Sequence, residues 1–271
     1  MEKSQHRTHK AYLNHKFLES PDARPIRILA EYLEPLERFE DERIRDTILI
    51  FGSARVMPRD EAEKMLAAAK RKGEGIGKAE RAVAMSRYYE DTRELAFRLT
   101  EWSKELKDPG RRFVICSGGG PGIMEAANRG ASEARGENVG LCIELPHEQT
   151  SNAYITHKLN FDFHYFFMRK FWFLYLAKAV VIMPGGFGTM DELFECLTLV
   201  QTGKMTKHLP IVLYGSEFWD SVLNLDVMVR FGTIDEKDLK LFHRADTVDE
   251  VFDYVTGELT RFALPAPGFS L

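Results

Sequence analysis

The sequence predicts an α/β protein built on a doubly wound parallel sheet, with helices on both faces and a helical extension at the N-terminus. Short apolar segments alternate along the chain with longer helix-forming segments. This alternation is typical of strand–helix–strand units. Three of the apolar segments end in glycine-rich turns. In such sheets ligands bind beyond the carboxyl ends of the strands, so these turns are where we expect a binding site.

Length and composition narrow the function classes. The chain has 271 residues, and its 37 basic and 41 acidic side chains leave a net charge of −4. This charge gives no general attraction to nucleic acid or to an anionic membrane. No apolar run approaches the roughly 18–20 residues of a membrane span, and the polar start of the chain does not resemble a signal peptide. We therefore expect neither a nucleic-acid partner nor a membrane partner.

The three cysteines lie inside apolar segments, at Cys116, Cys142 and Cys196. Their odd number and the lack of a CxxC pair favour buried, reduced thiols and a cytoplasmic protein. The eight histidines form neither an HExxH motif nor a cluster with cysteines. We expect no metal and no cofactor.

The chain reads as one domain with two appendages. Residues 1–44 are expected to form an arm and a helix, residues 45–262 the single nucleotide-binding domain, and residues 263–271 a loose tail. Pro25 suits the first turn of the extension helix. Pro35 is expected to kink or divide that helix.

Each strand is predicted from a short apolar or alternating run. The run Thr-Ile-Leu-Ile-Phe at 47–51 leads straight into Gly-Ser, which indicates a buried parallel strand followed by a tight turn. The same reasoning predicts the other strands, at 112–116, 138–145, 159–163, 179–183, 209–214 and 241–245.

The helices are predicted from the segments between these strands. Residues 58–106 are rich in Ala, Glu, Lys and Arg, and glycines at 73–77 divide them into two helices, the second over about 79–106. Further helices are expected at 123–135, 165–177, 189–202, 216–230 and 247–261.

The strongest motif is Pro184-Gly-Gly-Phe-Gly-Thr-Met-Asp-Glu192, which follows an apolar strand and opens a helix. Glycines allow the backbone to approach an anion, and a helix N-terminus offers free N–H groups. Gly185, Gly186, Gly188 and Thr189 are thus candidate phosphate ligands. A capping box, in which Thr189 caps the helix and Glu192 returns the hydrogen bond, explains the same spacing without a ligand.

A second glycine turn, Ser117-Gly-Gly-Gly-Pro-Gly122, also lies between a strand and a helix. It is not a GxGxxG fingerprint and lacks the Lys-Ser/Thr of a P-loop, which disfavours a dinucleotide or triphosphate. Together with the turn at Gly52-Ser53, it favours a nucleotide-like ligand. Its candidate contacts are Ser53, Gly118, Gly119 and Gly120.

Arg169 interrupts an otherwise aromatic helix segment at 166–173. An arginine among apolar residues needs an anionic partner. That partner is either a bound ligand or an acidic side chain in a packing salt bridge, and the sequence leaves both open. A pair at His147-Glu148 could line a site, although a loop turn is the preferred interpretation.

Together these motifs resemble the signature of the Lonely Guy family, whose members carry the older description of lysine decarboxylases. The resemblance rests on the 184–192 motif with Arg169-Lys170 upstream, and continues through 51–55, 117–128 and 145–149. It covers about residues 45–260. No lysine stands in a setting that suits a pyridoxal phosphate Schiff base, so decarboxylation is disfavoured.

The resemblance implies a Rossmann-like fold, a homodimer or larger homo-oligomer, and hydrolysis of nucleoside 5′-monophosphates to a free base and ribose 5-phosphate. The small-molecule partner would be AMP or a cytokinin riboside 5′-monophosphate. By position in the motif, Arg169 and Glu192 fall on the family's catalytic pair. Met124 and Lys170 are candidates for the base pocket.

The sequence also departs from the short cytokinin-activating members. Those tend to have Met-His-x-Arg-Lys where this chain has Phe166-Phe-Met-Arg-Lys170, and they lack both the N-terminal extension and the insert near 58–87. The chain thus resembles a longer bacterial branch. A non-catalytic carrier of a nucleotide or molybdopterin-type cofactor on the same fold is the alternative function.

Overall fold

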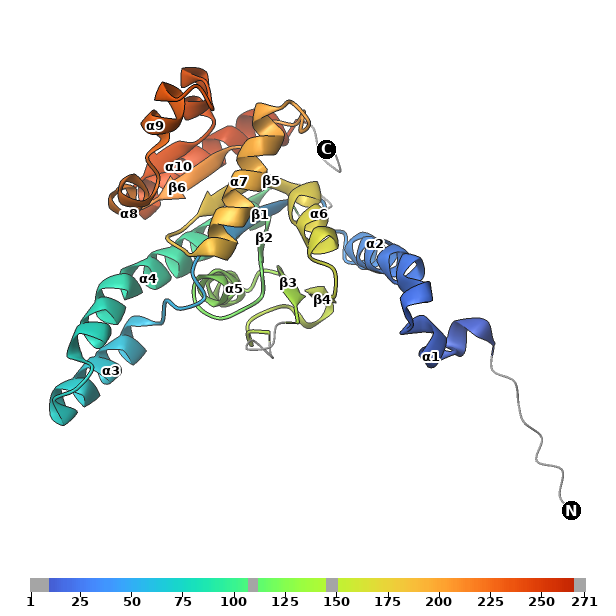
Figure 1. The fold of residues 1–271 in the computed structure, drawn as a ribbon, viewed down its shortest axis with the longest axis horizontal. Helices are drawn as coiled ribbons and strands as arrows, with labels where there is room; N and C mark the ends of the chain where they lie inside the picture. The colour runs from blue at the N-terminus through green and yellow to red at the C-terminus, as the bar shows by residue number, and fades with distance from the viewer. Residues whose placement is uncertain (1–9, 107–111, 145–150, 266–271) are drawn as a thin grey trace, which may run out of the picture.

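A computed structural model describes residues 10–106, 112–144 and 151–265. Its centre is one parallel sheet of seven strands in the order β4-β3-β2-β1-β5-β6-β7 (Figure 1). The fold is therefore Rossmann-like, as the sequence predicts. The strands are β1 (Thr47–Phe51), β2 (Val114–Ser117), β3 (Asn138–Ile143), β4 (Asn160–Phe163), β5 (Ala177–Ile182), β6 (Ile211–Tyr214) and β7 (His243–Ala245).

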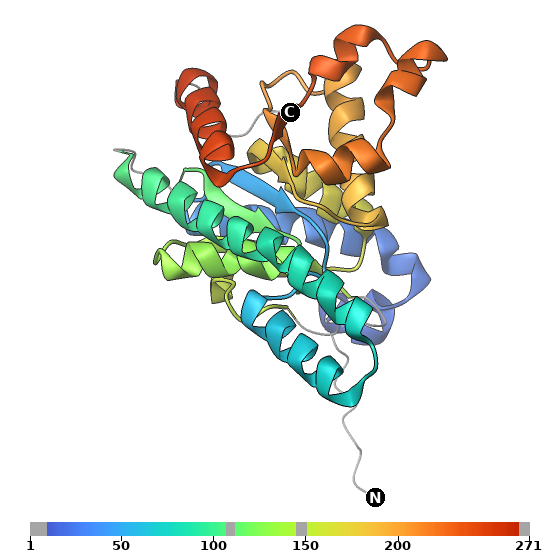
Figure 2. The ribbon, with the colours of Figure 1, turned by 90° about the vertical axis from the view of Figure 1, so that its left-hand side faces the viewer.

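Helices cover both faces of the sheet (Figure 2). One hydrophobic cluster joins α2, α6 and α7 to one face, and a second joins α4, α5 and α10 to the other. The α-helices are α1 (His15–Leu18), α2 (Arg24–Asp41), α3 (Arg59–Lys72), α4 (Ile76–Glu105), α5 (Ile123–Glu133), α6 (Phe166–Leu176), α7 (Phe187–Gln201), α8 (Ser216–Val222), α9 (Leu225–Arg230) and α10 (Val248–Glu258). No helix in these ranges is long and apolar enough to span a membrane.

A buried charge cluster ties together the amino ends of the central strands. Asp46 precedes β1 and is fully buried, and the Arg112 guanidinium donates to its carboxylate. Lys178 in β5 lies 3.7 Å from the same carboxylate. Arg112 also donates to the carbonyl of Ala263 at 2.9 Å, which links the C-terminal segment to the sheet. Ala263 was expected to belong to a loose tail but is buried, and residues 266–271 lie outside the described residues.

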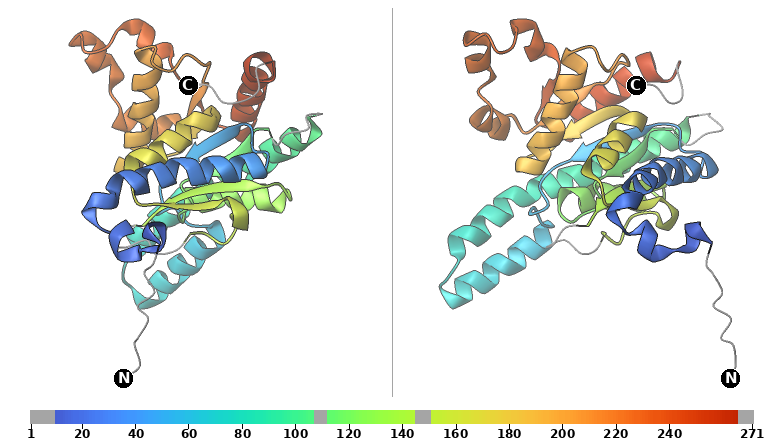
Figure 3. Two further views of the ribbon diagram at one scale, coloured as in Figure 1. Left: turned by 90° about the vertical axis from the view of Figure 1, so that its right-hand side faces the viewer. Right: turned by 45° about the vertical axis from the view of Figure 1, so that its right-hand side comes forward.

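The extension helix α2 is part of the core. Phe39 is fully buried against the sheet side chain Phe161, and Trp172 of α6 donates to the backbone carbonyl of Glu31 at 2.9 Å. Figure 3 shows α2 lying along α6. The helix runs unbroken through the buried Pro35, so the expected division is not found. Its packing on both sides of that proline supports the continuous form. Of the expected arm, residues 10–23 form short helical turns.

Of two breaks between consecutive helices, one was expected from the sequence and the other was not. Gly73 and Gly75 adopt left-handed backbone angles, with φ of 73° and 71°, and separate α3 from α4 as expected. This helical pair extends from the body of the molecule (Figure 1). The single helix expected over 216–230 is wrong. The chain leaves α8 at Leu223, and the Asn224 side chain accepts from the backbone N–H of Val227 at 3.2 Å to start α9.

Close packing of α4 on α5 yields a stability prediction. A Cβ atom added at Gly130 in α5 would overlap the backbone carbonyl of Arg93 in α4, whereas one at Gly257 in α10 meets nothing within 4 Å. We expect Gly130→Ala to lower the free energy of unfolding by about 1–3 kcal/mol because the helices must separate. Gly257→Ala should raise it by about 0.5–1 kcal/mol through helix propensity. Urea denaturation of both variants checks this, and equal effects would contradict it.

Candidate active site

The three glycine turns meet at one place because of the strand order. β1 pairs with β5 on one side and with β2 on the other. The strands β2 to β4 are added on one side of β1 and the strands β5 to β7 on the other, so the order of the strands reverses at this point. The backbone N–H of Ser53 donates to the carbonyl of Pro184 at 3.1 Å, and the carbonyl of Ser53 accepts from Ile123 at 3.1 Å. These two bonds join the turn after β1 to the turns after β5 and β2.

The turn after β2 needs glycine for close contact. Gly122 has a φ of 73°, and a Cβ atom there would overlap the carbonyl oxygen of Ser53. The same turn is also held by the last residue of β2, since the Ser117 hydroxyl accepts from the Gly119 N–H at 3.0 Å and donates to the Asn128 side chain in α5 at 2.7 Å. The backbone N–H groups of this turn are thus held in fixed positions.

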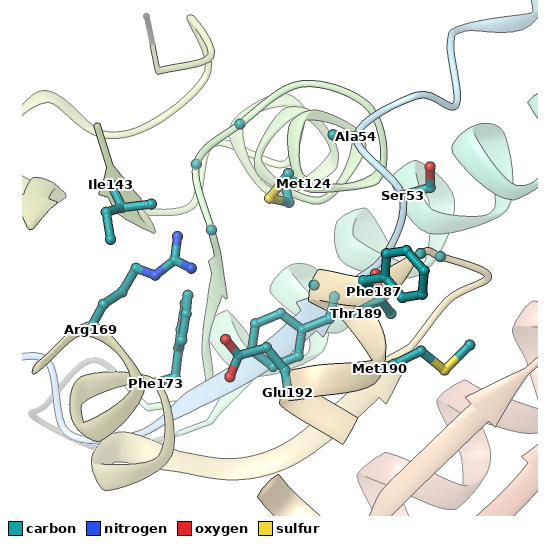
Figure 4. A pocket seen from close by; sticks show the side chains of 18 of the residues that line it. Ser53, Ala54, Met124, Ile143, Arg169, Phe173, Phe187, Thr189, Met190 and Glu192 are labelled. Atoms are coloured by element: carbon teal, nitrogen blue, oxygen red, sulfur yellow. The ribbon is translucent and has the colours of Figure 1, made fainter. Parts of the chain in front are cut away.

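These turns line a cleft of about 1250 Å³ at the carboxyl edge of the sheet (Figure 4). It includes Ser53, Gly118, Gly119, Gly120, Met124, Arg169, Gly185, Gly186, Gly188, Thr189 and Glu192. The structure therefore brings every candidate site residue except Lys170 to the wall of one cleft.

The α7 N-terminus opens into this cleft. The helix begins at Phe187. Its N-cap residue is Gly186, which has no side chain that could cap the helix. Thr189 lies inside the first turn, so the capping-box interpretation of Thr189 and Glu192 is wrong. The first three N–H groups of a helix have no partner within it, so they are available to an anion. Gly185 is required because a Cβ atom there would overlap the Thr189 hydroxyl.

Glu192 lies on the same side of α7, one turn further along. The residue is only 6% exposed. Burial raises the pKa of its carboxyl to about 7, and the neighbouring cations Lys170 and Arg169 reduce that rise. A carboxyl with such a pKa can accept and release a proton near neutral pH, as a general base or acid must.

Lys170 contacts a group of carboxylates rather than the cleft. Its ammonium lies 2.8 Å from Asp191, 2.8 Å from Glu195 and 3.6 Å from Glu192. Burial alone would lower the pKa of Lys170, but these carboxylates outweigh it and the pKa is raised. A place for Lys170 in the base pocket is therefore not supported.

Arg169 extends from α6 into the cleft toward the side occupied by Ile143 (Figure 4). Its guanidinium lies over the Phe173 ring at 5.4 Å and the Phe166 ring at 5.0 Å. The entry to α6 is fixed from α2, because the Glu31 carboxylate accepts from the backbone N–H groups of His164 at 2.8 Å and Tyr165 at 3.2 Å. The extension helix thus supports the segment that carries the arginine.

Several cleft residues were not expected from the sequence. Phe187, the variable residue of the glycine motif, is 96% exposed at the mouth of the cleft. Asn160 and Asp162 line the cleft from β4, where they alternate with buried phenylalanines. That alternation within a predicted strand was a signal that could have identified them. Residues 147 and 148 lie outside the described residues.

Cys116 and Cys196 are buried and Cys142 is half-buried, and all three are free thiols. Burial raises the pKa of Cys142 to about 12 and that of Cys196 to about 12. Within the described ranges, no group of three or more His, Cys, Asp or Glu side chains is arranged to hold a metal ion.

Comparison with known proteins finds distant relatives of this chain. A family model described as "Possible lysine decarboxylase" matches residues 124–255. The cytokinin riboside 5′-monophosphate phosphoribohydrolase LOG of Oryza sativa subsp. japonica is 28% identical over 155 residues, which is 56% of this chain and 62% of that protein. The probable phosphoribohydrolase LOG4 of the same plant is 27% identical over 147 residues, 53% of this chain and 62% of that protein. These matches support membership of the Lonely Guy family.

The match to these Lonely Guy relatives spans only 62% of their length. Among solved structures, the Moco carrier protein of Chlamydomonas reinhardtii is 18% identical, with 80% of this chain and all of that chain covered and a TM-score of 0.47. A second structure of that carrier gives 16% identity, 80% and 99% coverage and a TM-score of 0.46.

The raised pKa of Glu192 predicts how the stability of this protein depends on pH. The unfolded chain loses this proton near pH 4.5 and the folded chain near pH 7, so ionisation destabilises the fold as pH rises through that window. Glu192→Gln removes that effect. We expect it to raise the free energy of unfolding at pH 8 by at most about 3 kcal/mol and to have little effect at pH 4.

Thermal unfolding of the wild-type and Glu192→Gln proteins at pH 4, 6 and 8 makes this measurement. A gain that does not grow with pH would show that Glu192 titrates as it does in the unfolded chain.

Proposed function

We propose that this protein is a phosphoribohydrolase that cleaves the N-glycosidic bond of a purine-type nucleoside 5′-monophosphate, such as AMP or a cytokinin riboside 5′-monophosphate. The products would be the free base and ribose 5-phosphate. One observation carries the proposal: a buried carboxylate, Glu192, lies in the first two turns of α7, and the N-terminus of this helix opens into the same cleft. Binding alone requires the glycine turns but not that carboxylate.

The phosphate would bind at the start of α7. Gly186 and Gly188 leave the backbone accessible, since a Cβ atom at either position meets nothing within 4 Å. The N–H groups of the first turn and the Thr189 hydroxyl would contact the phosphate oxygens. Ser53 and the turn at Gly118–Gly120 face the same cleft and would hold the ribose and the remaining phosphate oxygens.

The ribose would then lie beside Glu192, since three residues of helix rise only about 4.5 Å. Departure of the base leaves positive charge on C1′ and the ring oxygen, which the carboxylate stabilises. A water oxygen bonds to C1′ while Glu192 accepts the water proton. The C1′–N bonding pair leaves with the base, whose nitrogen takes up a proton, so water is added across the bond.

The base would lie toward Arg169 and Met124. Met124 and Phe173 both lie close to Gly118, since a Cβ atom at that glycine would be 2.7 Å from the Met124 sulfur and 3.9 Å from the Phe173 ring. Their apolar surfaces suit the faces of a purine. Arg169 would orient the ribose or phosphate and offset the negative charge that develops on the departing base.

Assembly and location belong to the same proposal. We expect a homodimer or larger homo-oligomer acting in the cytoplasm, where the three free thiols stay reduced. Light scattering of the purified protein measures the assembly.

The deciding experiment is incubation of the purified protein with AMP, GMP, CMP and an N6-substituted AMP, with free base followed by chromatography. We expect release from at least one purine nucleotide, and a loss of at least about 10³-fold in kcat for Glu192→Gln with AMP binding retained. Release that survives in Glu192→Gln would contradict the assigned role. No release from any nucleotide, with AMP still raising the melting temperature, would favour the carrier.

The phosphate position predicts a separate effect at Gly188. A methyl group there has open space in the free protein, so Gly188→Ala should leave the melting temperature nearly unchanged. It would nevertheless face the bound phosphate and weaken AMP binding by about tenfold or more, since one lost phosphate contact is worth roughly 1.4 kcal/mol. Calorimetric titration checks this, with Gly257→Ala as the control. Unchanged affinity would place the phosphate elsewhere.

A further inference from the structure

Lys170 lies at the centre of three carboxylates on one helix. Asp191, Glu192 and Glu195 occupy adjacent positions on α7, and the Lys170 ammonium from α6 contacts all three. The two outer carboxylates bind at 2.8 Å and are partly exposed, with side chains 59% and 30% accessible. Glu192, at 3.6 Å, is the buried member. Asp191 and Glu195, which hold the ammonium, do not line the cleft. Glu192, the third carboxylate near the ammonium, does line it.

We propose that Lys170 is a positioning residue for this reaction: anchored by Asp191 and Glu195, its ammonium fixes the Glu192 carboxylate and stabilises its ionised form. The inference rests on the proposed function, because it concerns the same carboxylate. It changes the role of Lys170 from a base-pocket residue to one that acts through Glu192.

The charges around Glu192 explain why such a cation is needed. From α6 the carboxylate faces Lys170 and Arg169, and on α7 it faces Asp191, Glu195 and the thiol of Cys196. Both burial and the two neighbouring carboxylates favour the protonated form of Glu192. Arg169 is directed into the cleft, where a substrate anion would compete for its charge. Lys170, outside the cleft, keeps its position when the cleft fills.

Removal of this cation has an effect of known sign. Without Lys170, Glu192 is a buried carboxylate beside two like charges, and its pKa rises above about 7. Less of the enzyme then carries the ionised base at neutral pH. The acidic limb of the pH profile of kcat/KM should move to higher pH, because that limb reports the base in the free enzyme.

The test compares four variants with the wild type. We expect Lys170→Met to raise the midpoint of the acidic limb by one pH unit or more, and Lys170→Arg to restore it to within half a unit. Glu195→Gln removes a like charge while Asp191 still holds Lys170, so it should move the midpoint downward. Lys64→Met, which removes an exposed lysine paired with Asp60 on α3, should change nothing.

A loss of activity in Lys170→Met with an unchanged midpoint would mean that Lys170 only packs the two helices, and would overturn the proposal. Lys170→Gln serves as the second variant if the methionine form does not fold.

A measurement that does not need turnover separates this inference from the proposed function. Carbon-13 NMR of protein labelled at the glutamate carboxyls, with Glu192→Gln to assign the resonance, titrates Glu192 directly. If the wild type releases no base but the Glu192 midpoint rises in Lys170→Met, the proposed function fails and the electrostatic role stands. If the midpoint does not move, the role of Lys170 fails whatever the activity.

Discussion

Two backbone hydrogen bonds at Ser53 determine where everything else in the site lies. Its N–H donates to Pro184 and its carbonyl accepts from Ile123, so one residue joins the turns after β5 and β2. The start of α7, and with it the position of Glu192, depends on the first of these bonds. Because backbone groups make them, they do not use the Ser53 side chain, which lines the cleft and accepts a hydrogen bond from the backbone N–H of Arg55 at 3.1 Å. The close approach also explains why Gly122 has no room for a Cβ atom.

The site places opposing electrostatic demands on the fold. Burial of Glu192 disfavours its charge, whereas the general-base role that we propose for it requires that charge to be available. Two cations on α6 favour the charged form of Glu192: Arg169 lines the cleft, and Lys170 is held outside it by carboxylates of α7. Buried charges are tolerated when they are paired, and the cluster at Asp46 and Arg112 follows the same rule at the opposite edge of the sheet.

Most of the fold could be predicted because each central strand is an apolar run buried on both faces, as at 47–51. The site residues on the glycine turns could be predicted because each turn follows an apolar strand, and ligands bind beyond the carboxyl ends of such strands. What the sequence could not supply were contacts between distant helices. The bonds of Lys170 to α7 and of Glu31 to the start of α6 depend on how two helices pack, and no local pattern encodes that. The split between α8 and α9 was missed because a single capping side chain, Asn224, outweighed the helical periodicity.

The link between α2 and α6 has a consequence for biosynthesis. Glu31 and its partner His164 are 133 residues apart in the chain. At about 5–20 residues per second, α2 leaves the ribosome on the order of ten seconds before α6 exists. During that interval Phe39, later fully buried, has no core to enter. The nascent chain therefore carries an exposed amphipathic helix through about half of its synthesis, and a chaperone that binds such helices would find its target at residues 24–41.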